Sequence, residues 1–394
     1  MHSVELFTGA GGLALGLQGA GFEPVLMVEW NGDAYATIKA NAGRGGPTQG
    51  WPIHHGDVRD VIFQGMGEID LVAGGPPCQP FSIGGKHKGP NDPRDMWPHA
   101  IRAVRELTPK MFLFENVRGL AREAFADYLQ YIVERLRRPA MMAKPGESWN
   151  EHLERLKRLP AGHGNGPLYR VEIHKINAAD YGAAQKRHRV IIAGVRLDLG
   201  IEWNFPNPTH SRDALIWDQL ITRDYWKRHR ISSKTRDAII GGSKSLKGGA
   251  LNVKPNTKPW RTVRDALADL PDPEKSSKHG IPNHHFQPGA RSYAGHTGSV
   301  LDEPSKALKA GDHGVPGGEN MLLFPDGQVR YLTVRESARL QDFPDNFIFP
   351  GSWTETMRQL GNAVPVSMAT AIASSMGKAL ACGQGRKTKT RRTA

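Results

Sequence analysis

Short apolar runs recur along the first half of the chain, separated by stretches whose apolar positions follow helical spacing. Several of these runs end at glycine or at an acidic residue. Such runs are typical of buried strands, and the stretches between them are typical of crossover helices. The pattern predicts an α/β fold with a doubly wound, mostly parallel sheet and helices on both faces. The expected strands cover 3–7, 25–28, 70–73, 111–114, 169–176 and 190–195, with one more ending near residue 55, and helices are expected at 98–107, 124–138, 333–341 and 357–381.

The pattern changes near residue 200. Residues 201–330 lose the alternation of strands and helices and gain tryptophan, histidine, glycine and proline. They include a basic stretch at 223–236 and a glycine-lysine segment at 241–249. We therefore predict a second, smaller and more irregular domain. Earlier in the chain, a charged excursion at 139–167 is expected to be solvated and to carry no chemistry.

Charge narrows the choice of partners. The 394 residues include 52 lysines and arginines against 39 acidic residues, which gives a net charge of +13. A protein this basic is expected to meet a polyanion such as nucleic acid, although a solvated basic surface without a partner has the same composition. Basic residues are interleaved with Trp217, Tyr225, Trp226 and Trp260, which suits a nucleic-acid groove, but aromatic residues are more often core. The basic tail at 383–394 is expected to be disordered.

The amino terminus shows no signal-peptide pattern, and no apolar run is long enough to cross a membrane. We therefore place the protein in the cytoplasm and expect no membrane partner. The two cysteines offer neither a disulfide framework nor a cysteine-rich metal site, so no metal is expected.

The first strand is followed by a glycine-rich turn at 8–14. Its spacing matches the nucleotide fingerprint G-x-G-x-x-G/A, in the required setting of strand, turn and helix. The second strand ends at Glu29, where an acid commonly binds ribose hydroxyls, and Trp30 offers a flat face for an adenine. Asp57 adds a carboxylate after the third strand. Together these residues predict a nucleoside-type pocket, compatible with NAD, FAD or S-adenosylmethionine.

Cys78 lies in the sequence GGPPCQPFS at 74–82, directly after a buried strand. A free cysteine is by default a small buried hydrophobe, but prolines on both sides stiffen this loop and suit a thiol that must be aimed. Glu115 follows the next strand, so both residues are expected at one crevice, with Glu115 as a candidate general acid. The cations at 185–189 directly precede a strand and are either plain surface residues or, at a sheet edge facing the same crevice, would hold an anionic or carbonyl-bearing substrate.

These features leave different functions open. A nicotinamide-dependent oxidoreductase would share the glycine turn and Glu29, but it gives no role to Cys78 or to the arginine cluster. A DNA-binding module without enzymatic activity would explain the charge and the irregular second domain. It predicts that replacing Cys78 changes nothing.

Six sequence blocks, in their order and approximate spacing, resemble the cytosine-5 DNA methyltransferases of bacterial restriction-modification systems. They are FTGAGG at 7–12, GGPPCQPFS at 74–82, ENVRG at 115–119, QKRHRV at 185–190, RESARLQDFP at 335–344 and GNAVPV at 361–366. One block alone has little weight, but the ordered set reaches both ends of the chain and is highly specific.

The resemblance implies a mechanism and a set of site residues. The family uses S-adenosylmethionine, flips a cytosine out of duplex DNA and attacks its C6 with a cysteine thiolate. By motif match, Cys78 is the nucleophile, Glu115 contacts N3 and the exocyclic amine, and Arg189, supported by Arg187, binds O2. The residues at the family's cofactor positions are Phe7, Ala10, Gly12, Glu29, Trp30, Asp57, Val58, Pro77 and Asn362.

The resemblance also implies a domain plan. Residues 1–195 would form a Rossmann-like catalytic and cofactor-binding domain, and 196–350 an inserted target-recognition domain. Residues 351–382 would return to the catalytic domain, followed by the basic tail at 383–394. DNA would lie in the cleft, with the loop from Gln79 to about Arg94 closing over the flipped base.

The expected partners are double-stranded DNA and a cognate restriction endonuclease acting on the same site, and the protein is expected to be a monomer. One branch of the family methylates transfer RNA, which the long recognition region disfavours. Relatives commonly carry Thr-Leu where this chain has Ala307 and Leu308. The missing hydroxyl predicts weaker ordering of the flipped nucleotide without loss of catalysis.

Overall fold

The computed structural model describes residues 1–77, 95–160, 162–243, 251–275, 280–293, 296–310 and 320–390, with side chains up to residue 383. Within these residues, seven strands form one sheet in the order β3-β2-β1-β4-β5-β8-β6. The first five are parallel, and β8 runs antiparallel to both β5 and β6. Their bounds are β1 (His2–Leu6), β2 (Glu23–Glu29), β3 (Ile53–His55), β4 (Leu71–Gly74), β5 (Met111–Val117), β6 (Tyr169–Asn177) and β8 (His188–Arg196).

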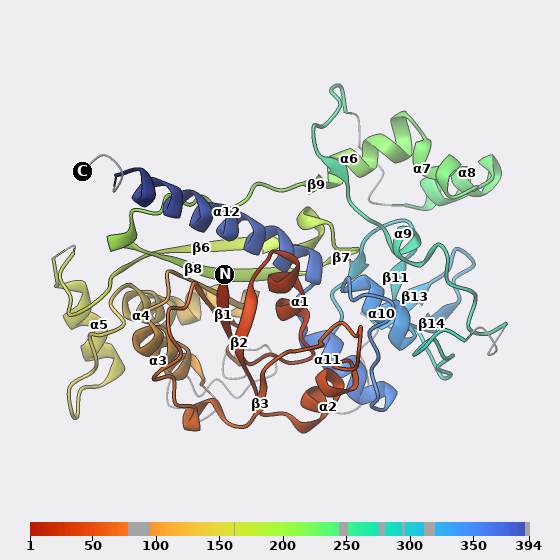
Figure 1. The fold of residues 1–394 in the computed structure, drawn as a ribbon. Helices are drawn as coiled ribbons and strands as arrows, with labels where there is room; N and C mark the ends of the chain where they lie inside the picture. Colours follow the sequence, from red (N-terminus) through yellow and green to blue (C-terminus); the bar gives the residue numbers. More distant parts are fainter. Residues whose placement is uncertain are drawn as a thin grey trace.

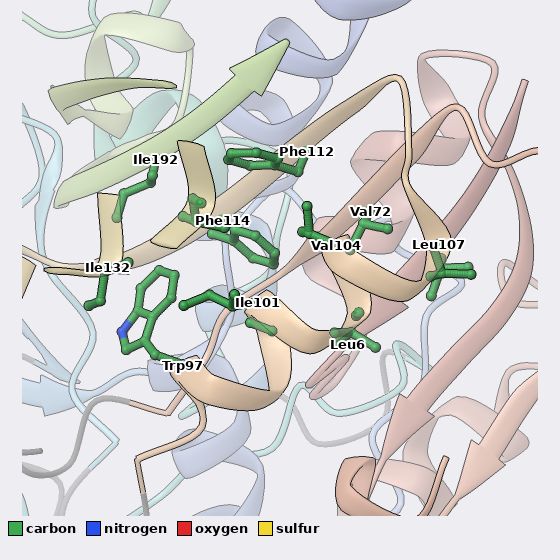
Figure 2. Close-up of a cluster of buried hydrophobic side chains, with 14 of the residues drawn as sticks. Leu6, Val72, Trp97, Ile101, Val104, Leu107, Phe112, Phe114, Ile132 and Ile192 are labelled. Carbon is green, nitrogen blue, oxygen red and sulfur yellow. The ribbon is translucent and has the colours of Figure 1, made fainter. Parts of the chain in front are cut away.

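Both faces of the sheet are covered by helices, as the apolar runs predict. Helices α1 (Gly12–Gly19) and α12 (Val366–Thr390) pack on one face, and α3 (Trp97–Leu107) and α4 (Ala126–Arg137) pack on the other (Figure 1). Successive side chains of a strand point to opposite faces. Phe112 and Phe114 of β5 therefore enter the core below α3, shown in Figure 2, while Leu113 enters the core below α1 and α12.

The chain's last helix packs closely on its first. At Gly16, an added Cβ would lie 2.3 Å from the Cβ of Ala369 and 2.9 Å from the backbone nitrogen of Thr370. Only glycine permits this approach of the two backbones. The carboxyl-terminal segment is therefore part of the amino-terminal sheet structure.

The sequence predicted that the charged excursion after α4 is solvated. The structure shows instead that it contains a helix with a buried face. Its helix α5 (Trp149–Lys157) buries His152, Leu153 and Leu156. The Trp149 ring packs edge-to-face on Tyr128 of α4, with ring centroids 5.6 Å apart. Mixed charge along the helix concealed this apolar face in the sequence. Burial and nearby arginines lower the pKa of His152 to about 4, so this ring is neutral at physiological pH.

The elements between β8 and α10 are short and irregular, as the sequence predicted for this part of the chain. Helices α6 (Arg212–Ile216), α7 (Asp224–Arg228) and α8 (Ser233–Gly242) form a lobe at one end of the molecule (Figure 1). The Tyr225 and Trp226 side chains are buried in this lobe, so they are core residues and not groove contacts. The other elements are α2 (Gly32–Ala40), β7 (Gln185–Lys186), β9 (His210–Ser211), β10 (Lys258–Pro259), α9 (Val263–Leu267), β11 (Ser299–Val300), β12 (Ser305–Lys306), β13 (Met321–Leu323), β14 (Val329–Tyr331), α10 (Val334–Leu340) and α11 (Trp353–Asn362).

The helical region predicted at 357–381 consists of two helices, because Pro365 cannot continue α11 and the chain turns at Ala363 before α12. The tail at 383–394 was predicted to be disordered. The backbone of α12 is described as far as Thr390, and residues 391–394 lie outside the described part of the chain. The earlier turns of α12 are fixed on α1, and extending an existing helix costs far less than starting one. In the described part of the chain, no helix is long and apolar enough to cross a membrane.

Candidate active site

The turn between β1 and α1 is built from unusual backbone conformations. Gly9 and Gly11 have φ of +57° and +89°, and Phe7 adopts +58° without being glycine. Such a conformation costs a non-glycine residue about 1–3 kcal/mol and tends to occur at functional sites. No side chain caps the start of α1 among the described residues. Its backbone N–H groups are therefore suited to a polar or anionic ligand.

Glycine is required in this turn because distant segments pack against it. An added Cβ at Gly12 would lie 2.3 Å from the backbone oxygen of Val364, and one at Gly11 would lie 2.7 Å from the Trp51 ring. Val364 is two residues after Asn362, which ends α11 and is exposed. The sequence motif near the carboxyl terminus thus lies against the amino-terminal turn.

Glu29, at the end of β2, organises the neighbouring backbone. One carboxylate oxygen accepts a hydrogen bond from the Gly9 N–H at 2.6 Å, and the other accepts one from the Asn31 N–H at 2.6 Å. Burial raises the pKa of Glu29, while these backbone donors oppose the rise. The carboxylate therefore joins the glycine turn to the start of α2.

Trp30 and Asp57 lie at the same edge of the sheet and differ in how they are held. The Trp30 side chain is 70% exposed, an unusual position for a large flat ring. Asp57 accepts a hydrogen bond from the Arg59 N–H at 2.9 Å and pairs with the Arg59 guanidinium, which lowers the Asp57 pKa. Trp30 thus offers an open apolar surface beside two carboxylates.

A second group of predicted residues meets at the ends of β5 and β8. The Glu115 carboxylate forms an ion pair with the Arg189 guanidinium, and both side chains are largely buried. β5 continues to Val117, which pairs with Arg189, so both groups lie within strands and not after or before them as predicted. This pairing fixes the distance between the two residues through the backbone.

The segment leading to Cys78 passes directly over Glu115. An added Cβ at Gly75 would lie 3.3 Å from a Glu115 carboxylate oxygen. The side-chain amide of Asn116 donates a hydrogen bond to the backbone oxygen of Pro76 at 3.0 Å. Cys78 and the loop at 79–94 lie outside the described residues. The chain is therefore held against Glu115 up to Pro77, the residue before the cysteine.

Arg187 lies close enough to Glu115 and Arg189 for their charges to act on it, and its guanidinium is held by backbone oxygens. Its side chain is 1% exposed and donates hydrogen bonds to the backbone oxygens of Leu308 at 3.0 Å and Gly361 at 2.6 Å. Burial lowers its pKa well below the usual value. Arg187 therefore ties the sheet to the second region and to α11. The amide of Gln185 supports the same junction by accepting from the Leu308 N–H at 3.2 Å.

This geometry combines a nucleotide-type turn with a carboxylate–guanidinium pair below the backbone that leads to Cys78. The model of the C-5 cytosine-specific DNA methylase family matches residues 1–139 and 146–378. The chain belongs to this family. It is accordingly a DNA cytosine-5 methyltransferase.

Curated relatives match the methyltransferase along nearly its whole length. The type II methyltransferase M.PspPI of Psychrobacter is 33% identical over 385 residues, covering 96% of this chain and 78% of the relative. The type II methyltransferase M.NgoMIV of Neisseria gonorrhoeae is 31% identical over 384 residues, covering 96% and 97%.

Solved structures share the fold at lower identity. A protein described as a DNA modification methyltransferase encoded in an E. coli prophage superposes with a TM-score of 0.58 at 23% identity, covering 97% of this chain and 99% of that one. Dnmt2 of S. pombe gives a TM-score of 0.57 at 18% identity, with coverage of 96% and 99%. The mixed α/β architecture is therefore common to these proteins.

The other predicted cofactor residues of the methyltransferase lie around the same turn, but not all expose a side chain. Ala10 is 2% exposed and packs in a core shared with Leu308 and Leu360, and Val58 is also buried. Neither of these two side chains is open to a ligand in this structure. Pro77 is exposed at the crevice edge.

Sequence reasoning missed two residues that shape the site of the methyltransferase. Asn116 holds the backbone before Cys78, and Arg358 donates a hydrogen bond to the Asn31 side-chain oxygen at 3.2 Å. Both lie in or beside recognised sequence blocks. The sequence offered only one signal for these two residues, namely that each is polar and lies in or next to a motif. Their hydrogen-bond partners are distant in sequence and could not be inferred from it.

Proposed function

We propose that the methyltransferase transfers a methyl group from S-adenosylmethionine to C5 of a cytosine flipped out of duplex DNA, through a covalent bond between Cys78 and C6. The observation that supports this most is the Glu115–Arg189 ion pair directly below the backbone that leads to Cys78. A carboxyl and a guanidinium at that place match the hydrogen-bonding edge of a cytosine.

The residues around the glycine turn fit the methyl donor. The Glu29 carboxylate retains lone pairs for ribose hydroxyls after accepting from Gly9 and Asn31, and the exposed Trp30 ring offers an adenine its face. When bound, S-adenosylmethionine supplies an electrophilic methyl group on a sulfonium. Asn362, adjacent to the turn through the contact of Val364 with Gly12, would close the pocket from the carboxyl-terminal side.

The chain's own residues account for activation of the base. The Cys78 thiolate forms a bond to C6, and the electron pair of the C5–C6 double bond moves into the ring. Glu115 shares a proton with N3 and accepts from the exocyclic amine, so negative charge does not accumulate on the base. Arg189 donates to O2 and holds the Glu115 carboxyl in place. C5 becomes nucleophilic as a result.

The adduct is then resolved. The new C5–methyl bond forms as the methyl–sulfur bond of the donor breaks. A base, supplied by solvent or by the protein, removes the C5 proton, the ring double bond re-forms, and Cys78 leaves as thiolate. Atoms and charge balance with one methylated cytosine, one demethylated donor and one proton.

The proposed domain plan rests on where the proposed catalytic and cofactor residues lie in the chain. Residues 1–195 and 351–382 form the catalytic unit, and 196–350 read the DNA sequence from the facing side. The net charge of +13 supports a duplex partner. We also propose that the protein acts in a restriction-modification system with a cognate endonuclease, and that it is a cytoplasmic monomer. The names of its type II relatives support the role in a restriction-modification system.

Transfer of label from methyl-tritiated S-adenosylmethionine tests the function. We expect incorporation into duplex DNA, followed by bisulfite mapping of methylated cytosines to one short sequence. Transfer RNA and duplex DNA that lacks the mapped sequence serve as controls and are expected to remain unlabelled. Label in RNA alone, or label in neither nucleic acid, would overturn the proposal.

A further inference from the structure

Arg358 connects α11 to the residues that precede α2. Its guanidinium donates two hydrogen bonds to the Glu355 carboxylate, from Nε at 2.7 Å and from Nη2 at 2.6 Å. The same Nη2 donates to the Asn31 side-chain oxygen at 3.2 Å. The fork of the guanidinium is thus held on its own helix and directed at the opposite segment.

Asn31 passes this contact on to the donor pocket. Its side-chain oxygen also caps α2 by accepting from the Ala34 N–H at 2.9 Å, and its own N–H donates to Glu29 at 2.6 Å. The other Glu29 oxygen holds the Gly9 N–H. One hydrogen-bonded chain therefore runs from Arg358 through Asn31 and Glu29 to the glycine turn.

A second contact holds the other end of α2. The Asn41 amide donates to the Ile348 backbone oxygen at 2.7 Å and accepts from the Ile348 N–H at 2.7 Å. Ile348 lies at the end of the proposed recognition region, and Arg358 follows that region on α11, before the last helix. Both ends of α2 are therefore fixed by the segment that returns from the DNA-reading side.

We propose that Arg358 is a positioning residue for the methyl donor, because it fixes from α11 the turn at 29–31 that the donor contacts. This inference rests on the proposed cofactor site and adds a residue to it. Correct seating of α11 then becomes a condition for tight donor binding. Arg358 acts through Asn31 and Glu29, without itself touching the reacting atoms.

Donor affinity should depend on pH through Glu29. Burial raises the pKa of this carboxyl, and the positive charge of Arg358 opposes the rise. The ionised carboxylate accepts ribose hydroxyls better, so affinity falls as pH falls through the Glu29 pKa. Removal of Arg358 raises that pKa further, and the loss of affinity then begins at a higher pH. The charged and titratable groups around this carboxyl are Glu5 on β1, Asp33 on α2, His55 on β3, and Glu355 and Arg358 on α11.

Calorimetric titration of the full-length protein with S-adenosylmethionine tests the inference. Arg358→Met is expected to raise the Kd about tenfold, a difference of about 1.4 kcal/mol, and to move the pH at which affinity declines upward. Arg358→Lys retains the charge and should keep the wild-type pH profile with an intermediate Kd. In methylation assays of Arg358→Met, the KM for the donor should rise by a larger factor than kcat falls.

A matched control separates positioning from general loss of stability. Arg339 makes comparable ion pairs with Asp269 and Asp345, neither of which is a residue of α2 or of the chain from Arg358 to Gly9, so Arg339→Met should bind the donor within twofold of wild type. Repeating the pH series in a Glu5→Gln background removes the other buried carboxyl from the titration. The shift caused by Arg358→Met should persist there.

Two results would overturn the inference. The first is an Arg358→Met protein with wild-type Kd and pH profile. The second is an equal loss of affinity in Arg339→Met and Arg358→Met with no change of pH profile. If the wild-type protein itself bound no S-adenosylmethionine, the proposed cofactor and this inference would both be wrong, which is distinguishable from either result.

Discussion

Glu115→Gln is expected to lower the turnover of methyl transfer by about 10²- to 10⁴-fold, the usual contribution of a positioned acid or base. Glutamine keeps the shape of the side chain but cannot share a proton with N3 of the base. It also removes the charge partner of Arg189, with which Glu115 forms a largely buried ion pair. Turnover is measured at saturating donor and DNA, and donor affinity should stay close to wild type because Glu29 is unchanged.

Glu134→Gln is the matched control for this variant. Glu134 is also a buried carboxylate on α4, and it pairs with Arg137 of the same helix and with Arg138, which directly follows it. Its replacement removes a comparable ion pair and should reduce stability without a large change in turnover. Equal effects of the two substitutions on turnover would show that Glu115 has no chemical role.

Gly16→Ala is expected to destabilise the protein by about 1–3 kcal/mol, although alanine is intrinsically the better helix former by about 1 kcal/mol. The new Cβ would lie 2.3 Å from the Ala369 Cβ and 2.9 Å from the Thr370 backbone nitrogen. Backbone atoms cannot rotate away, so α12 must move off α1. The urea midpoint measured by circular dichroism should therefore fall.

Gly19→Ala on the same helix should behave in the opposite way. The nearest atoms to its added Cβ are those of the Thr370 side chain, at 3.7 and 3.8 Å, which is ordinary contact. Its midpoint should stay the same or rise. If Gly16→Ala were as stable as Gly19→Ala, the close packing of α1 on α12 would be disproved.

The strands of the sheet could be predicted in outline because they are buried on both faces. Continuous apolar runs such as Met111 to Phe114 carry that signal directly. The ends of the strands could not be predicted equally well. β5 continues through Glu115 to Val117 because β8 pairs with it, and a partner strand distant in sequence leaves no local pattern.

The candidate site likewise has residues that could be predicted from the sequence and residues that could not. The places of Glu29, Trp30 and Glu115 at one edge of the sheet could be predicted because each follows or ends a continuous apolar run in the sequence. The burial of Arg187 could not, because charged residues are almost never fully buried and its acceptors are the backbone oxygens of Leu308 and Gly361. Long-range hydrogen bonds between polar groups have no periodicity in sequence, so the link from Arg358 to Asn31 also required the fold.

The covalent step is the central claim, and trapping on 5-fluorocytosine tests it most directly. Fluorine at C5 cannot be removed as a proton is, so the Cys78–C6 bond should persist in the presence of S-adenosylmethionine. On duplex DNA containing the mapped target with this base, wild-type protein and Cys382→Ala should give an adduct stable to denaturing electrophoresis, whereas Cys78→Ala should give none. Cys382 is the exposed cysteine on α12. An adduct formed by Cys78→Ala, or none formed by wild-type protein that methylates the normal target, would contradict the account.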